Sequence, residues 1–198
     1  MANPSISKTP SHEVPQGADA FALLGLTPAF DVDLAVLEKA FFERSKELHP
    51  DRFASAPAHE RVVALSKSRA LNDAYTILKK PVSRAEYLLG RAGVTIGDNE
   101  RLDPASLMPI LEDREQLQDA IHGKRLTEVA KLQTAMQATR ARELELVREQ
   151  FALVEEARRA GGPQASVDEP IAQIKKILIL MRYVDRYLEA CDAALDEE

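Results

Sequence analysis

Apolar residues recur every three or four positions through most of the chain, which is the spacing of one buried face of an α-helix. Leu34, Leu37, Phe41 and Leu48 show this spacing in one amphipathic segment. Ala, Leu, Glu and Arg are abundant, whereas aromatic residues make up only 5% of the chain and Trp is absent, a composition that favours helices over sheet. We therefore predict an all-α protein with helices over approximately residues 33–48, 57–79, 83–91, 104–121, 124–160 and 169–195, after a short helix that begins at Asp19.

Breaks in this pattern divide the chain into modules. Residues 1–18 contain three prolines and no apolar periodicity, so we predict a disordered tail. Gly93 and Gly97 indicate a linker, and Asp103-Pro104 has the residue types of a helix start. The predicted organisation is a tail (1–18), a helical-hairpin module (19–92), a linker (93–102) and an antiparallel three-helix bundle (103–198).

One loop joins the two helices of the hairpin, with the sequence Leu48-His49-Pro50-Asp51-Arg52-Phe53. Pro50 disfavours an α conformation at His49 and cannot donate a hydrogen bond to the preceding turn, so the helix must end there. We expect His49 and Asp51 to face solvent on either side of the rigid proline. Acid–base catalysis by His49 with Asp51, in a helical hydrolase, stays an alternative, although nothing nearby in the sequence supplies a nucleophile or an oxyanion site.

This loop and two later segments resemble the J-domain co-chaperones of the HscB type. The segments are HPDRFA, then Leu71-Asn72-Asp73-Ala74-Tyr75 and Arg84-Ala85-Glu86-Tyr87-Leu88-Leu89. The His-Pro-Asp tripeptide is shared by J-domains generally, whereas the following basic residue and Phe, and the RAEYLL segment, are more specific to the HscB branch. The resemblance implies that residues 19–92 form a J-domain. It implies a co-chaperone that stimulates ATP hydrolysis by a DnaK-type (HscA-like) chaperone and delivers to it the (IscU-like) scaffold on which iron–sulfur clusters are assembled.

The resemblance implies a chaperone-binding surface at the loop and on the helix before it. Its expected members are His49, Pro50, Asp51, Arg52, Lys46, Arg44 and Lys39. Asp51 is expected to pair with an arginine of the ATPase partner, because a charge-assisted pair strengthens when binding removes water from it. Glu43 and Glu47 are interleaved with the basic residues of the helix, a departure from the family that weakens the electrostatic attraction.

The resemblance places scaffold binding in the bundle. The corresponding residues are Leu107, Met108, Leu111, Glu112 and Glu115, with either Tyr183 or Ile179 on the last helix. Helical geometry independently directs Ile179 and Tyr183 away from the inward stripe of that helix. We expect them to join Met108 and Leu111 in one exposed apolar patch, bordered by charged residues that include Arg182. An alternative is that these side chains contact the J-domain or a second copy of the chain.

Charge and cysteine content limit the remaining possibilities. The net charge of −6, concentrated in residues 93–198, argues against nucleic acid as a partner, and no run is apolar enough to span a membrane. Cys191 is the single cysteine and lies on an inward stripe, so we expect no disulfide, no metal site and no cofactor; the N-terminal CxxC pairs that bind zinc in some relatives are missing. Residues 1–18 lack the features of a targeting segment, so we expect a bacterial cytoplasmic protein.

Overall fold

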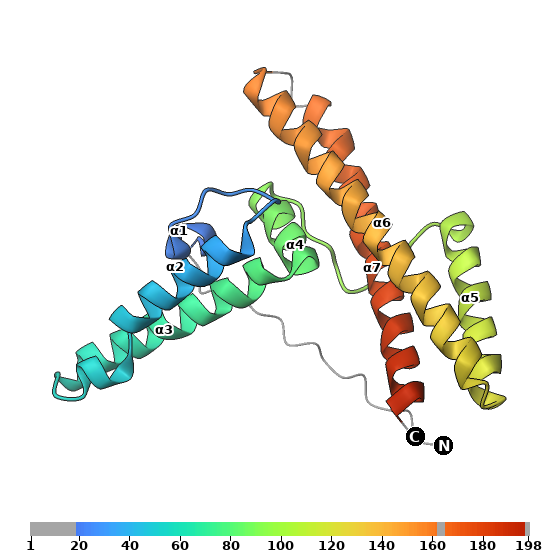
Figure 1. Cartoon of the computed structure of the whole chain (residues 1–198). Coiled ribbons are helices and arrows are strands. Elements are labelled where there is room, and N and C mark those ends of the chain that lie inside the picture. Colours follow the sequence, from blue (N-terminus) through green and yellow to red (C-terminus); the bar gives the residue numbers. More distant parts are fainter. Residues whose placement is uncertain (1–18, 162–164, 197–198) are drawn as a thin grey trace. The chain divides into compact units, whose positions relative to one another are not determined.

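The computed structural model describes residues 19–161 and 165–196 of the chain. Every regular element within these ranges is a helix, which confirms the predicted all-α fold (Figure 1). The chain divides into two compact units, one ending at Arg84 and the other beginning at Ala85. This boundary falls inside a helix and precedes the predicted end of the first module at residue 92. The predicted tail, residues 1–18, lies outside the described residues.

The N-terminal unit is built on an antiparallel pair of helices. α2 (Leu34–Glu47) and α3 (Ala58–Lys79) lie side by side, and α1 (Ala20–Leu24) packs against both (Figure 1). Each helix of the pair carries an apolar stripe, and pairing removes both stripes from water. The core formed in this way contains Phe21, Leu24, Leu37, Leu71, Ala74 and Leu78.

The turn that ends α1 depends on a glycine. Gly25 has a φ of 68°, in the left-handed region that glycine adopts without strain. A side chain at this position would also collide with the guanidinium of Arg44 on α2. Arg44 therefore lies against the turn after α1 rather than on the outer surface of α2.

α4 (Pro81–Arg91) follows α3 after a single residue. The buried guanidinium of Arg84 donates a hydrogen bond to the carbonyl of Leu78 and lies 5.3 Å from the centre of the Phe30 ring. Because the last carbonyls of a helix lack intrahelical donors, this arginine caps α3. α4 begins two residues before the predicted start, since proline suits the first position of a helix.

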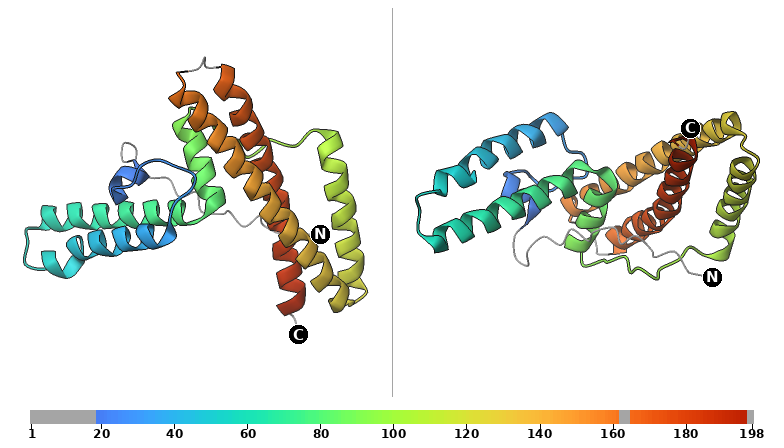
Figure 2. Two further views of the ribbon diagram at one scale, coloured as in Figure 1. Left: turned by 45° about the horizontal axis from the view of Figure 1, so that its top comes forward. Right: turned by 90° about the horizontal axis from the view of Figure 1, so that it is seen from below.

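The C-terminal unit is built on a long antiparallel pair, α6 (Leu126–Arg159) and α7 (Ala165–Asp196) (Figure 2). The shorter α5 (Pro104–His122) packs against this pair through its last turns. One core cluster joins all three helices and contains Leu117, Ala120, Val129, Met136, Val184, Tyr187 and Cys191. The predicted antiparallel three-helix bundle is confirmed, with α5 covering only part of the α6–α7 pair.

α7 begins earlier than predicted, at Ala165 rather than near residue 169. Pro170 lies inside the helix, where its missing N–H removes one intrahelical hydrogen bond. Val167, which precedes it, is buried, so the additional turn contributes apolar contact. The predicted start was therefore four residues too late.

Candidate functional site

The chain between α2 and α3 folds into one turn of 3₁₀-helix, η1 (Pro50–Phe53). His49, just before it, is extended, with φ −60° and ψ 132°. The following proline favours this conformation, and the Arg52 N–H closes the turn by donating to the His49 carbonyl at 3.0 Å. The prediction that the helix ends before His49 is confirmed.

His49 holds the backbone of Asp51 at the tip of the helix pair. The Asp51 N–H donates to His49 Nδ1 at 3.3 Å, and Asp51 Oδ2 lies 3.5 Å from the same nitrogen. The side chains of His49 and Asp51 are 59% and 90% exposed. The Asp51 carboxylate is therefore open to a cation on another molecule.

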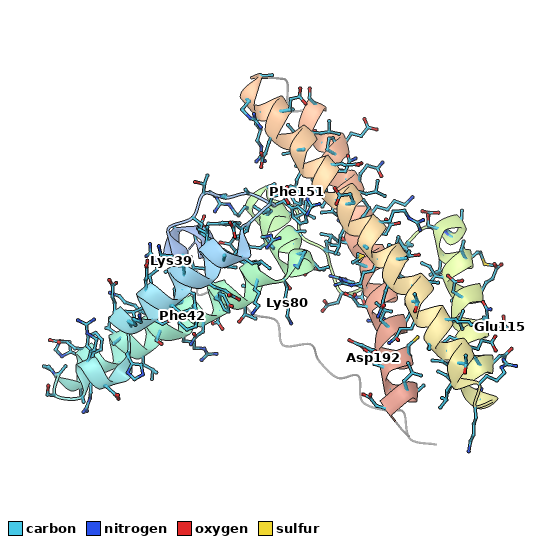
Figure 3. The ribbon with its side chains drawn as sticks, viewed as in Figure 1. Lys39, Phe42, Lys80, Glu115, Phe151 and Asp192 are labelled. Atoms are coloured by element: carbon cyan, nitrogen blue, oxygen red, sulfur yellow. The ribbon has the colours of Figure 1, made fainter. Side chains whose placement is uncertain are left out.

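Lys39 and Lys46 lie on the outer face of α2, opposite the buried Leu37 (Figure 3 labels Lys39). Arg52 Nη1 lies 3.5 Å from the Lys46 carbonyl, which connects the loop to this face. Arg44 does not join the two lysines, because it is turned toward Gly25. The outer face of α2 therefore carries two of the three basic residues predicted for it, Lys39 and Lys46.

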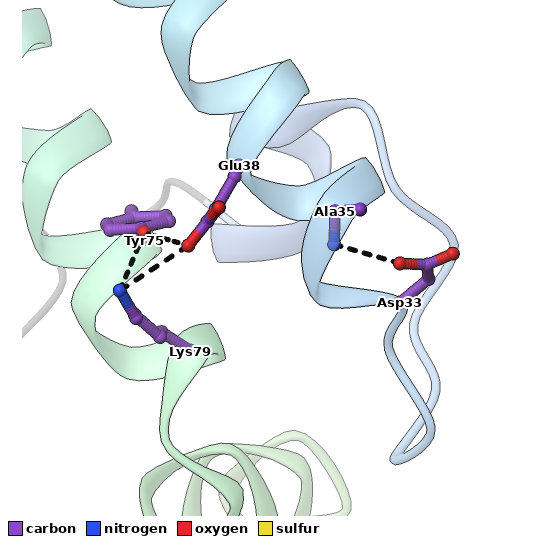
Figure 4. A network of polar contacts seen from close by, with 5 residues as sticks. All are labelled: Asp33, Ala35, Glu38, Tyr75 and Lys79. Atoms are coloured by element: carbon purple, nitrogen blue, oxygen red, sulfur yellow. Dashed lines mark hydrogen bonds and ion pairs between the residues drawn. The ribbon is translucent and has the colours of Figure 1, made fainter.

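A polar network fixes α2 against α3 (Figure 4). The hydroxyl of Tyr75 donates to Glu38 Oε1 at 3.3 Å, and Lys79 Nζ lies 3.1 Å from that hydroxyl and 3.5 Å from Glu38 Oε1. The hydrogen bond to Tyr75 raises the pKa of Lys79. The ring of Phe41 stacks on that of Tyr75 with centroids 4.3 Å apart. These contacts hold the arm that carries the loop.

The first half of α5 carries exposed apolar side chains. Met108 is 55% exposed and Leu111 is 46% exposed, whereas Leu107 is half-buried. Glu112 and Glu115 are exposed on the same half of the helix (Figure 3 labels Glu115). This surface exists because only the last turns of α5 enter the core. The exposure expected for these α5 side chains is confirmed.

Ile179 is not part of an exposed patch, because its side chain is only 7% exposed. Lys175 and Arg182 lie on the same face of α7, four residues before it and three after it. Lys175 Nζ pairs with Glu100 Oε1 at 2.9 Å. Arg182 Nη1 donates to the Gly97 carbonyl at 3.0 Å. The predicted exposure of Ile179 was wrong, because the segment before α5 is bound along this face.

Tyr183 is half-buried and follows Ile179 by four residues, about 40° further around α7. Lys176, Tyr183 and Tyr187 share one face of the helix, at spacings of seven and four residues. Lys176 Nζ pairs with Asp103 Oδ2 at the start of α5 at 3.3 Å. Tyr187 belongs to the same core cluster as Leu117, toward the end of α5. Tyr183 therefore lies between two points at which α5 is anchored, which favours it over Ile179 as the α7 member of the candidate site.

Known proteins share both the sequence and the fold. Residues 102–192 match the family described as the HSCB C-terminal oligomerisation domain. Over 149 residues the chain is 39% identical to the co-chaperone protein HscB homolog of Vibrio vulnificus (strain CMCP6), covering 74% of this chain and 84% of that relative. The chain belongs to the HscB family of co-chaperones. A second HscB homolog, from Bordetella avium (strain 197N), is 39% identical over 133 residues, covering 65% of this chain and 79% of the relative.

Two solved HscB structures have a similar fold. Chaperone HscB from Vibrio cholerae aligns with a TM-score of 0.65 at 30% identity, covering 85% of this chain and 96% of that one. The human co-chaperone protein HscB aligns with a TM-score of 0.74 at 25% identity, covering 90% of this chain and 82% of that one. The likeness of this HscB-family chain to both structures therefore extends over its two units. Within its described residues, no helix combines the length and apolar character needed to cross a membrane.

Two features of this HscB-family chain were not predicted from the sequence. The segment from Gly97 to Glu100 is bound to α7, and its Gly and Asp-Asn composition gave no signal of that contact. Phe42 is exposed on the outer face of α2 (Figure 3). A signal for Phe42 did exist, because it follows the inward-facing Phe41 by one residue and so lies about 100° further around the helix.

Proposed function

We propose that this HscB-family chain stimulates ATP hydrolysis by a DnaK-type (HscA-like) chaperone and delivers to it the (IscU-like) scaffold on which iron–sulfur clusters are assembled. The observation that carries the proposal is the Asp51 carboxylate, 90% exposed at the tip of the helix pair, with its backbone N–H held by His49. Family membership supplies the classes of partner. In keeping with its bacterial relatives, we place this activity in the bacterial cytoplasm.

Asp51 suits transient pairing with an arginine of the chaperone. A carboxylate that is hydrated in the free chain gains a charge-assisted hydrogen bond when an interface excludes water, and a guanidinium offers two donors in the matching plane. Because η1 already fixes the loop, binding orders little additional backbone. Arg52, Lys46 and Lys39 add positive potential that attracts an acidic surface on the partner.

The first half of α5, together with Tyr183, supports client binding. Met108 and Leu111 form an apolar centre with Glu112 and Glu115 beside it, which is the composition of a protein interface with a polar rim. The acidic rim favours a client with a basic surface. A client held by the same chain that contacts the chaperone is presented to that chaperone at a raised effective concentration.

The test is ATP turnover by the cognate DnaK-type chaperone, measured alone, with this chain, and with this chain plus the scaffold. We expect the chain to raise turnover and the scaffold to raise it further. His49→Gln is expected to abolish stimulation without changing scaffold binding, because the two sites share no residue. Leu111→Ala combined with Tyr183→Ala is expected to weaken scaffold binding by about 10- to 100-fold and to leave stimulation of the chaperone alone intact.

Two outcomes would redirect the proposal. If the double variant bound the scaffold as tightly as the wild type, the chain would serve a different client through the same chaperone. If the chain turned over a substrate without any chaperone, the hydrolase alternative based on His49 would replace the co-chaperone proposal. Scaffold binding by isothermal titration calorimetry and turnover by phosphate release separate these outcomes.

A further inference from the structure

Phe42 lies on the solvent-facing side of α2 although it is a large apolar residue. Its side chain is 62% exposed, whereas Leu37 on the opposite side of the helix is fully buried. Isolated exposed apolar residues are common on protein surfaces, so exposure alone does not indicate a partner. Its surroundings are more informative.

Two lysines flank Phe42 on the same face. Lys39 precedes it by three residues and Lys46 follows it by four, which places both next to it on the helix surface (Figure 3 labels Lys39 and Phe42). Within the ranges that the structure describes, neither lysine forms an ion pair. Glu43 lies on this face as well and reduces its net positive charge. An apolar ring between two lysines that form no ion pair still matches an apolar depression bordered by acidic groups.

The ring of Phe42 is also held in place. Its centroid lies 6.0 Å from that of Phe41, with the planes at 60°, an edge-to-face arrangement. Phe41 in turn stacks on Tyr75 of α3, with centroids 4.3 Å apart. A ring supported in this way loses little rotamer freedom on binding, which is a property of aromatic anchors in interfaces.

The position of Phe42 connects it to the loop. It stands seven residues before His49, about two helical turns or roughly 10 Å along the axis of α2. Lys46 lies between them, and its carbonyl contacts the guanidinium of Arg52 at 3.5 Å. The outer face of α2 is therefore continuous with the proposed chaperone-binding loop.

We propose that Phe42 is the apolar anchor of the chaperone-binding surface, seated in an apolar depression of the ATPase partner whose acidic rim meets Lys39 and Lys46. This inference rests on the proposed function and adds a specificity determinant to it. The loop delivers the charge that acts on the ATPase, whereas Phe42 supplies affinity and selects a partner that has a matching depression.

The experiment is ATPase stimulation of the cognate DnaK-type chaperone as a function of co-chaperone concentration. Phe42→Ser is expected to raise the concentration for half-maximal stimulation about 10- to 30-fold without lowering the rate at saturation, because the loop is unchanged. Phe42→Leu keeps most of the apolar area and is expected to stay within about threefold of the wild type. Val36→Ser is the matched control, since Val36 is also exposed on α2 but lies about 120° away around its axis.

Salt separates the apolar contribution from the electrostatic one. The two salt concentrations, 50 mM and 500 mM, give Debye lengths that differ roughly threefold. The concentration of Phe42→Ser for half-maximal stimulation, divided by that of the wild type, is expected to be the same in both. The same ratio for Lys46→Gln is expected to fall toward one at the higher salt concentration, because salt screens the charge that this variant removes. If the ratio for Phe42→Ser also fell to one at high salt, the assignment of Phe42 as an apolar anchor would be overturned.

Each remaining outcome has a distinct meaning. If the wild type stimulates the chaperone and Phe42→Ser does so equally well at every concentration, the Phe42 inference is overturned and the proposed function stands. If the wild type does not stimulate the chaperone, the proposed function fails and this inference with it. If Phe42→Ser abolishes a concentration-dependent dimer seen by sedimentation while stimulation is unchanged, the occupant is a second copy of the chain, which also overturns the inference.

Discussion

The loop between α2 and α3 and the first half of α5 are both exposed candidate sites, but they are exposed for different reasons. The loop is shaped by its own residues, since the proline imposes the turn and His49 Nδ1 accepts from the Asp51 N–H. The α5 surface has no such local device. It is open because the core that α5 shares with α6 and α7 is confined to the last turns of α5.

This difference separates function that is encoded locally from function that depends on tertiary contacts. A substitution of Asp51 at the tip of the loop is expected to change binding without changing stability, because that side chain is 90% exposed. Around α5 and α7, some substitutions are expected to change binding and others to change stability, because neighbouring residues on one helix differ in burial. Ile179 is buried, whereas Tyr183, one turn later, is half-buried.

The largest effect is expected from Asp51→Asn. Loss of one partner of a desolvated charge pair costs about 2–5 kcal/mol, so stimulation of the DnaK-type chaperone at low co-chaperone concentration is expected to fall about 30-fold or more. The thermal midpoint by circular dichroism is expected to stay at the wild-type value, because the backbone N–H that His49 accepts is still present. A lowered midpoint would show that the loop depends on the carboxylate for its fold, contrary to the local encoding described above.

The second effect concerns stability in the C-terminal unit. Ile179→Ala is expected to lower the free energy of unfolding by about 2–4 kcal/mol, because it leaves a cavity between α7 and the segment that Lys175 and Arg182 bind. Leu111→Ala is the matched control and is expected to change this free energy by less than about 0.5 kcal/mol. Urea unfolding followed by circular dichroism measures both.

The same pair of variants, assayed for scaffold binding, sharpens the comparison. Leu111→Ala is expected to weaken binding while the fold is unchanged. Ile179→Ala is expected to bind normally under conditions in which it is still folded. Equal stability of the two variants would mean that the segment before α5 does not cover α7 in solution.

Much of the fold could be predicted because helical periodicity is a local property. The helix that became α2 was predicted within one residue at each end, since Asp33 caps its start and the residue before Pro50 leaves the α conformation. α7 was harder, because its apolar residues occupy more than one face. A periodic pattern identifies the face that meets α6 but does not show that α5 and the segment before it cover two others.

In the candidate sites, too, residues placed by local backbone could be predicted, whereas residues placed by tertiary contacts could not. His49 and Asp51 could be placed from the sequence, because a proline fixes the backbone on which both stand. Arg44 and Lys46 are both cationic and two residues apart on one helix, yet only Lys46 lies on the outer face. Arg44 lies inward against the glycine turn after α1, about twenty residues earlier in the chain. Contacts of this kind leave no periodic signal.

The smallest effect is a pH dependence that tests whether the start of α5 is anchored to α7. Asp103 caps α5 by accepting from the Ser106 hydroxyl at 2.7 Å and its N–H at 2.9 Å, and it pairs with Lys176. The hydrogen bonds from Ser106, followed by the contact with Lys176, lower the pKa of Asp103 from 3.8 to about 2. Because the pKa is lower in the folded state, the stabilisation is fully present above about pH 4 and is lost as the pH falls through 2.

Asp103→Asn isolates this contribution, because asparagine is also a good N-cap residue but carries no charge. We expect the stability difference between wild type and variant to be constant above about pH 4, to shrink between pH 4 and pH 2, and to decrease with added salt, since these groups are exposed to solvent. The carboxyl carbon of Asp103, followed by NMR through the same range, is expected to titrate near pH 2. Titration at the ordinary value of 3.8 would mean that the capping contacts and the pair with Lys176 are absent in solution. Tyr183 would then no longer lie between two anchored ends of α5, and the reason for preferring it to Ile179 would be lost.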